Sequence, residues 1–160
     1  MSFNIRKTRS KRAQSSFELL ITVSFGLIIL IPVVVLAFIQ ISASNSNLAA
    51  TEAQAAASKL ASIATSIGAQ GYPAKQLALI QVPPNVQNVY VGTQGNGVGH
   101  SIIFVITTSG GTSDVTAYTP INVSGLLASV SVQGTYLINV SAQNTCPSNP
   151  SLPCVYMQPA

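Results

Sequence analysis

The hydrophobic pattern changes twice along the chain, and each change predicts a different kind of element. Residues 19–41 form an apolar segment that contains no Lys, Arg, Asp or Glu. Residues 48–67 are alanine-rich, with apolar positions at helical spacing, which predicts an amphipathic helix. Beyond Pro73 the apolar residues tend to alternate with polar ones, as in strands with one buried face. The pattern therefore predicts a helix followed by a β-rich region.

The apolar segment is long enough to cross a membrane. As a helix, its 23 residues would span roughly 35 Å, and a hydrocarbon core is about 30 Å thick. Pro32 lies near its middle and removes one helical hydrogen bond. The alternative is a secretory signal, whose apolar region has about 7–15 residues before a small-residue cleavage site. Only residues 42–44 would supply such a site.

The helix is expected to continue beyond the membrane, over residues 14–67, after an unstructured leader of residues 1–13. Gly68 and Gly71 are predicted to end it. The apolar or small positions of its second half, residues 48–67, are Leu48, Ala49, Ala56, Leu60, Ile63 and Ile67. This face can dock under a sheet or pack against neighbouring helices.

The remaining residues, 72–160, predict a small β-rich head. The expected strands are residues 77–82, 86–91, 102–106, 114–119, 126–132 and 135–142, with a tight hairpin connection at residues 133–134. The continuous apolar run 102–106 predicts a central strand buried on both faces, and residues 92–99 and 108–113 predict loops. The fold class is therefore α+β, with a long N-terminal helix and an antiparallel sheet or small sandwich packed on its distal half.

The charge distribution indicates a membrane orientation. Five of the seven basic residues precede Gln14; from Gln14 onward two Lys and three acids sum to −1, although the whole chain carries +4. A basic run directly before an apolar span holds the N-terminus in the cytoplasm, so the head lies outside. The high pI belongs to the leader, so no nucleic-acid partner is expected.

A short motif stands at the boundary between the basic run and the apolar segment. It consists of Arg12, Ala13, Gln14, Ser16 and Glu18. This motif resembles the class III signal peptide of archaeal type IV pilin-like proteins, in which Gln, Ser and Glu alternate with other residues. Ala13 stands where that family usually has Gly. The resemblance covers the N-terminal part of the chain, up to the end of the apolar segment.

The resemblance implies a processing and assembly pathway. Prepilin peptidase would cleave between Ala13 and Gln14 and leave the apolar segment in place. The precursor would reside in the cytoplasmic membrane, and a pilus assembly platform would polymerise it with other copies into a surface filament for adhesion or attachment. Glu18 would neutralise the new α-amino group of a neighbouring subunit, since a carboxylate beside an apolar helix needs a cationic partner.

Two alternatives share this N-terminal organisation. One is a membrane-anchored minor pilin-like binding module that never forms the body of the filament. The other is a motility subunit of the archaellin type, although the pattern of Gln14, Ser16 and Glu18 favours the pilin branch.

Other side chains in the head suggest modification rather than catalysis. Cys146 and Cys154 are predicted to form a disulfide in an exported, proline-rich tail, the alternative being two free thiols. Asn122 and Asn139 begin Asn-x-Ser sequons and are candidate glycosylation sites.

No catalytic set can be assembled from the ionisable residues of the head. His100 is the only His and Asp114 the only Asp of the chain. Paired carboxylates are therefore missing, and a nucleophile–base–acid set would require these two residues to meet. We expect no enzyme, no cofactor and no metal site.

Overall fold

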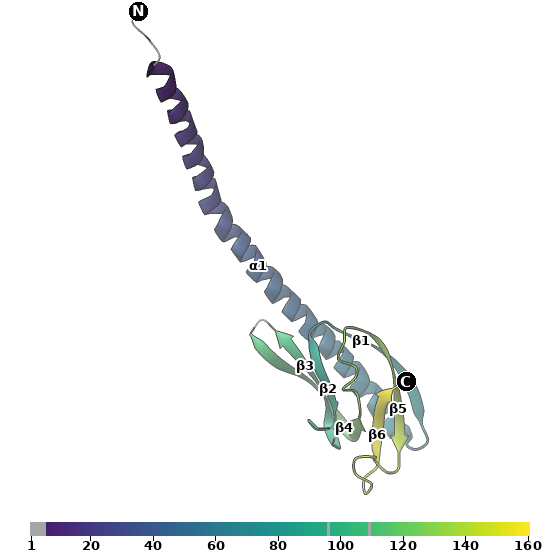
Figure 1. Cartoon of the computed structure of the whole chain (residues 1–160). Coiled ribbons are helices and arrows are strands. Elements are labelled where there is room, and N and C mark those ends of the chain that lie inside the picture. Colours follow the sequence, from purple (N-terminus) through teal and green to yellow (C-terminus); the bar gives the residue numbers. More distant parts are fainter. Residues whose placement is uncertain (1–5, 96, 109) are drawn as a thin grey trace, which may run out of the picture. The chain divides into compact units, whose positions relative to one another are not determined.

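The structure, a computed structural model, describes residues 6–95, 97–108 and 110–160, with side chains from residue 16 onward (Figure 1). Within these ranges, a helix is followed by six strands. The elements are α1 (Arg6–Gln70), β1 (Lys75–Val82), β2 (Val86–Val91), β3 (Gly99–Thr108), β4 (Gly111–Gly125), β5 (Gly134–Gln143) and β6 (Cys154–Pro159). The predicted fold class, a long helix followed by a sheet, is confirmed. The chain divides into two compact units, residues 1–43 and 44–160.

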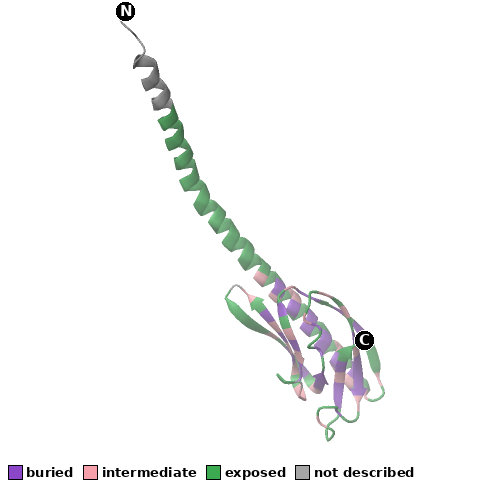
Figure 2. Cartoon of the chain, in the orientation of Figure 1, coloured by how far each residue is buried: buried purple, intermediate pink, exposed green. Residues whose placement is uncertain are grey.

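The first unit contains the N-terminal part of α1. Every large apolar side chain from Phe17 to Ile41 is exposed (Figure 2). Pro32 lies inside the helix, which continues through it. Among the described residues, Ser16–Gln70 is the one helix long and apolar enough to cross a membrane. This helix is therefore compatible with membrane insertion.

Both ends of α1 differ from the prediction. The helix begins at Arg6 rather than at residue 14, so it includes much of the leader that was expected to be unstructured. Residues 6–13 contain Arg, Lys and Ala and no Gly or Pro, a composition that favours helix. Gly68, which was predicted to stop the helix, lies within it. The helix ends at Gln70 because Gly71 adopts φ 70° and donates its N–H to Ile67 O at 3.1 Å, as in an αL cap.

The second half of α1 packs in the core of the second unit. Its buried face is made mostly of alanine: Ala49, Ala53, Ala56, Ala57, Leu60, Ala61, Ala64 and Ile67. The amphipathic character predicted for residues 48–67 is present, but Leu48 is 61% exposed and Ile63 is only half-buried. Small side chains allow the sheet to approach the helix closely, so alanine rather than the larger residues defines most of the face. Lys59 adds a hydrogen bond from Nζ to Leu79 O, 2.7 Å away on the edge strand β1.

The six strands form one sheet in the order β1-β5-β6-β4-β2-β3, with a further pairing between β3 and β4. The head is therefore a single sheet and not a sandwich, which was the other predicted form. All pairings are antiparallel except that of β4 with β6, which is parallel over Val123–Gly125 and Val155–Met157. The last strand of the chain thus lies between β5 and β4.

The strand β3 was predicted to be central and buried on both faces. It does pair on both sides, with β2 and with β4. Only one face is buried: Ile102, Phe104 and Ile106 are fully buried, whereas Ile103 and Val105 are half-buried. The prediction of two buried faces is wrong because α1 covers one face of a single antiparallel sheet and no described element forms a layer on the other.

The other strand predictions had mixed outcomes. The strand predicted at residues 86–91 is β2, whereas the strand predicted at residues 126–132 is a loop, so no hairpin forms at residues 133–134. Its apolar pattern arises because Leu127 and Val130 are buried in the core from within that loop. The predicted loop at residues 108–113 is much shorter, since β3 reaches Thr108 and β4 begins at Gly111. The strand β6 was not predicted at all.

Candidate functional site

The residues of the N-terminal motif lie on α1. The side chains of Arg12, Ala13 and Gln14 are outside the described residues. Ser16 and Glu18 are described and exposed, and Glu18 O accepts a hydrogen bond from Thr22 Oγ1 at 2.8 Å. The Glu18 carboxylate forms no ion pair with any residue whose side chain is described. It therefore stands at the start of an exposed apolar helix surface without an internal partner in the described part of the chain.

The two cysteines are joined, as predicted. Cys146 and Cys154 form a disulfide with their Cα atoms 5.4 Å apart, which excludes the alternative of two free thiols. The loop they close is also hydrogen-bonded internally, from Cys146 N to Leu152 O (2.9 Å) and from Asn149 N to Cys146 O (3.0 Å). Because Cys154 is the first residue of β6, the disulfide fixes the entry of the chain into the sheet.

Both candidate glycosylation sites lie in paired strands. Asn122 is on β4, half-buried, and its Nδ2 donates to Pro153 O at 3.5 Å. Asn139 is on β5, half-buried, between Leu77 of β1 and Gln158 of β6. The hydroxyl residues of the two sequons, Ser124 and Ser141, are both buried. A glycosylating enzyme would have to reach the sequons before the strands pair, since the folded head covers their hydroxyl groups.

The structure does not bring His100 and Asp114 together. His100 neighbours Ser101, which pairs with Tyr118, whereas Asp114 lies four residues earlier on β4, about 13 Å along a strand. His100 Nδ1 is 3.1 Å from Ile121 O, and its ring stacks on that of Tyr118 with a centroid separation of 6.0 Å. Gln94 Nε2 donates to Asp114 Oδ2 at 3.2 Å. Among the described residues, no cluster of His, Cys, Asp and Glu could hold a metal ion.

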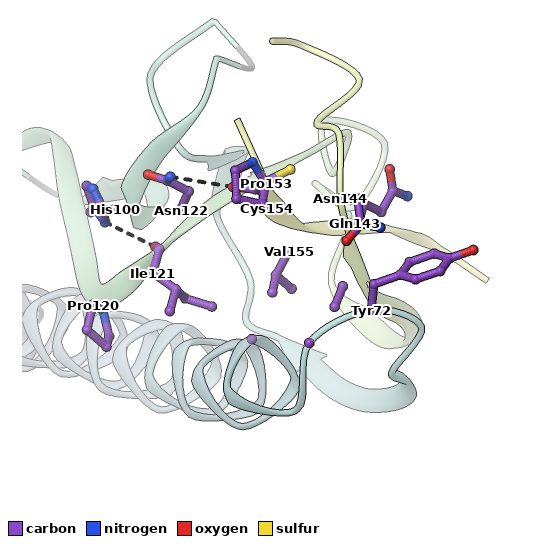
Figure 3. Close-up of a pocket in the computed structure, with 13 residues that line it drawn as sticks. Tyr72, His100, Pro120, Ile121, Asn122, Gln143, Asn144, Pro153, Cys154 and Val155 are labelled. Carbon is purple, nitrogen blue, oxygen red and sulfur yellow. Dashed lines mark hydrogen bonds between the residues drawn. The ribbon is translucent and has the colours of Figure 1, made fainter. Parts of the chain in front are cut away.

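A hollow of about 340 Å³ with a mixed polar and apolar lining lies in the head, where the C-terminal end of α1 meets β4, β5 and β6 (Figure 3). It is named the polar hollow for its hydrogen-bonding side chains. Ile121 and Val155 supply apolar side chains. Ile121 packs directly on Gly68, where a Cβ would collide with it, whereas the space beside Gly71 is open. The polar side chains that line it are His100, Asn122, Gln143, Asn144 and Tyr72. Figure 3 shows His100 and Asn122 on one side of the hollow and the other three on the opposite side.

Sequence reasoning missed this hollow for an identifiable reason. Tyr72 directly follows the predicted helix end at Gly71, and Gln143 and Asn144 follow the predicted strand of residues 135–142 without forming any motif. The hollow exists because β6, which was not predicted, places Cys154 and Val155 beside the end of α1. No local motif in the sequence marks these residues, because they come together only through the fold.

The chain was compared with protein-family models, with curated proteins and with solved structures, and no match was found in any of the three comparisons.

Proposed function

We propose that this chain is a structural subunit of a type IV pilus-like surface filament that serves adhesion or surface attachment. The observation that carries the proposal is the first half of α1, where every large apolar side chain from Phe17 to Ile41 is exposed. An apolar surface on all sides of a helix must be covered by lipid or by other helices. The motif of Gln14, Ser16 and Glu18 directly precedes this surface.

The second half of α1 supports a polymer rather than a simple anchor. A membrane anchor needs only the apolar segment, whereas here the helix continues to Gln70 and forms the core of the head with residues such as Leu60 and Ile67. Each subunit would bring its own head with its helix, so that a filament with a helical core displays heads on its surface. Copies of the same chain are the expected partners along the filament.

In the proposed pathway, the apolar helix moves from the lipid of the membrane into the core of the filament. The precursor is inserted in the cytoplasmic membrane, prepilin peptidase removes residues 1–13, and an assembly platform transfers the processed chain into the filament. The transfer replaces lipid by neighbouring helices around residues 19–41. In the filament, Glu18 pairs with the α-amino group of Gln14 of another copy, and a misaligned subunit would leave this buried charge without a partner.

Intact mass measurement of filaments sheared from cells tests the proposal. We expect an abundant species that begins at Gln14, with any excess mass reporting glycans at Asn122 or Asn139. The membrane fraction of cells without prepilin peptidase, which should hold the precursor, serves as the control. A chain that stays in the membrane of normal cells with residues 1–13 attached would overturn the proposal.

A second candidate function is a membrane-held binding module, and the polar hollow in the head favours it. In that case the processed chain would recruit a ligand or cap a complex without forming the filament body. The number of copies per filament discriminates the two functions, because a major subunit accounts for most of the filament mass and a minor one for a small fraction.

A further inference from the structure

We propose that the polar hollow is one half of a carbohydrate-binding site for a chain of at least two sugar units. A second hollow of about 320 Å³ adjoins it and is lined by Lys75, Ser141 and Thr145. The two hollows share Tyr72, Ala142, Gln143 and Asn144. Each volume is near the lower end of ligand sites, about 300–1,000 Å³, so each hollow fits one small ring and the pair fits a short chain.

The polar groups of the first hollow match a neutral ligand rich in hydroxyl groups. No Asp, Glu, Lys or Arg lines it, so a charged ligand would lose its hydration without gaining a counter-charge. The side-chain amides of Gln143 and Asn144 make no hydrogen bond to any other described residue. Each amide offers both donors and an acceptor, and a sugar hydroxyl also donates and accepts. Binding would therefore replace water at two partly or fully exposed amides that make no hydrogen bond within the described part of the head.

Tyr72 supplies the apolar surface that a sugar ring requires. Its side chain is 64% exposed and lies at the boundary of the two hollows. An aromatic ring offers a flat apolar face for the C–H groups of a sugar, while its hydroxyl remains able to form a hydrogen bond. Figure 3 shows Tyr72 on the same side of the hollow as Gln143 and Asn144, with its ring directed away from His100 and Asn122. Tyr72 also lines the second hollow, so a ligand that occupies both hollows passes this residue.

One wall of the site, formed by Asn122, Pro153 and Cys154, is fixed before a ligand arrives. The disulfide holds Cys154, which lines the first hollow, and Asn122 Nδ2 bridges to Pro153 O. A fixed site loses less conformational entropy on binding. A peptide ligand is less suited, because peptides that add to a sheet need a free strand edge. Here β6 pairs with β5 on one side and with β4 on the other, so it offers no free edge.

The test uses the full chain in detergent micelles, produced in a host without N-glycosylation. The probes are immobilised di- and trisaccharides of glucose, galactose, mannose and N-acetylglucosamine, their uronic-acid counterparts, and random neutral peptides. We expect saturable binding of at least one saccharide and none of the peptides. Binding of a uronic acid in preference to its neutral form would place that unit in the second hollow, beside Lys75. Binding of peptides alone, or of nothing, would overturn the proposal.

Variants locate the binding on the chain. Tyr72→Ala and Asn144→Ala should each weaken saccharide binding by about tenfold or more, whereas Tyr90→Ala should not change it. Tyr90 is the control because it lies half-buried on β2 and lines neither hollow. Equal binding by all three variants would contradict the site.

A measurement on the unmodified chain keeps the proposal testable if the variants fail to fold. In NMR spectra of the micelle-bound chain, the side-chain amide signals of Gln143 and Asn144 should shift when the saccharide is added. Unchanged amide signals at saturation would overturn the proposed contacts.

A second preparation of the chain, isolated with its native glycans, distinguishes the two possible sources of the carbohydrate. If the saccharide belongs to another copy of this chain, glycosylated chains should associate and Tyr72→Ala should abolish the association. If it belongs to a foreign surface, only added saccharide should bind. The inference does not rest on polymerisation, since filament yield and saccharide binding are measured separately and either can fail without the other.

Discussion

At the scale of single residues, backbone conformation fixes the position of Gly92. It follows β2 with φ 93°, and a Cβ there would collide with Gly97 O and lie 2.7 Å from Val123 O. Gly92 also bonds Ser101 twice: its N–H donates to Ser101 O, and its O accepts from Ser101 Oγ, each at 2.8 Å. The glycine therefore brings three backbone segments closer together than any other residue would permit.

Replacing this glycine should be far more costly than replacing one that has a positive φ alone. Gly92→Ala should lower the free energy of unfolding by about 2–5 kcal/mol, the sum of backbone strain and overpacking. Gly71→Ala is the matched control, because Gly71 has φ 70° but open space around its Cα, and it should cost about 1–2 kcal/mol. Denaturant unfolding of both variants measures the difference, and equal losses would refute the collision.

Glu18 allows a residue-scale test of assembly. Glu18→Leu should leave membrane insertion intact, because it lengthens the apolar surface, but should reduce the filament yield by about tenfold or more, since pairing with the neighbouring α-amino group is lost. Glu52→Gln is the control, as Glu52 also lies on α1 but beyond the apolar segment. Quantifying sheared filaments against membrane-inserted chain gives both readouts. A normal yield from Glu18→Leu would remove this carboxylate from the assembly mechanism.

At the scale of elements, α1 has two environments on one continuous helix. Up to Ala43 its described side chains are exposed, and from Ala49 onward one face is buried in the head. Leu48 and Leu60 illustrate the difference, since the first is 61% exposed and the second is fully buried. The same residue type on the same helix therefore contributes very differently to the stability of the head.

The two leucines give a paired prediction. Leu60→Ala should lower the free energy of unfolding of the head by about 2–5 kcal/mol, because it leaves a cavity beneath the sheet. Leu48→Ala should change it by less than about 0.5 kcal/mol. The two variants are compared by thermal or denaturant unfolding, in which circular dichroism monitors the loss of the sheet. Similar effects of both variants would mean that the helix does not pack on the sheet through this face.

The elements that could be predicted from the sequence are those with local signals. The apolar segment, β2 between Pro84 and Gly92, and the paired cysteines each have local boundaries or a local partner. The strand β6 could not be predicted, because Pro153 and Pro159 flank its short apolar run and its pairing with β4 is distant in sequence. The loop containing Leu127 was mistaken for a strand because burial in a core produces the same apolar pattern in either conformation.

The candidate site also contains one part with a local sequence signal and one part without such a signal. The motif at Gln14, Ser16 and Glu18 is short and local, so its role is proposed from the residues alone. The polar hollow combines the end of α1 with three strands, and Tyr72, Asn122 and Asn144 become neighbours only after the sheet has formed. No local pattern marks such residues, since the information lies in the topology.

At the scale of the whole molecule, the two compact units need different surroundings. Residues 44–160 have their own core, which includes Phe104, Ile138 and Met157. The described side chains of the first unit contribute nothing to that core. The unit that contains the sheet should therefore be stable without the apolar helix.

Removing residues 1–43 should yield a folded, monomeric protein in detergent-free buffer, whereas the full chain should require detergent or lipid. Analytical ultracentrifugation and circular dichroism check the two forms. The full chain in micelles should show the same thermal transition of the sheet as the shortened chain. A shortened chain that aggregates or lacks sheet signal would show that the head depends on the N-terminal segment.

The place of β6 in the sheet has a consequence for the order in which the head forms during synthesis. In the described part of the chain, β6 is the strand that joins the pair β1 and β5 to the group of β2, β3 and β4. Both groups precede β6 in the chain, so they leave the ribosome before the strand that joins them. Until β6 has been made, the sheet of each new head is divided in two. A premature stop codon before Cys154 would leave it divided permanently.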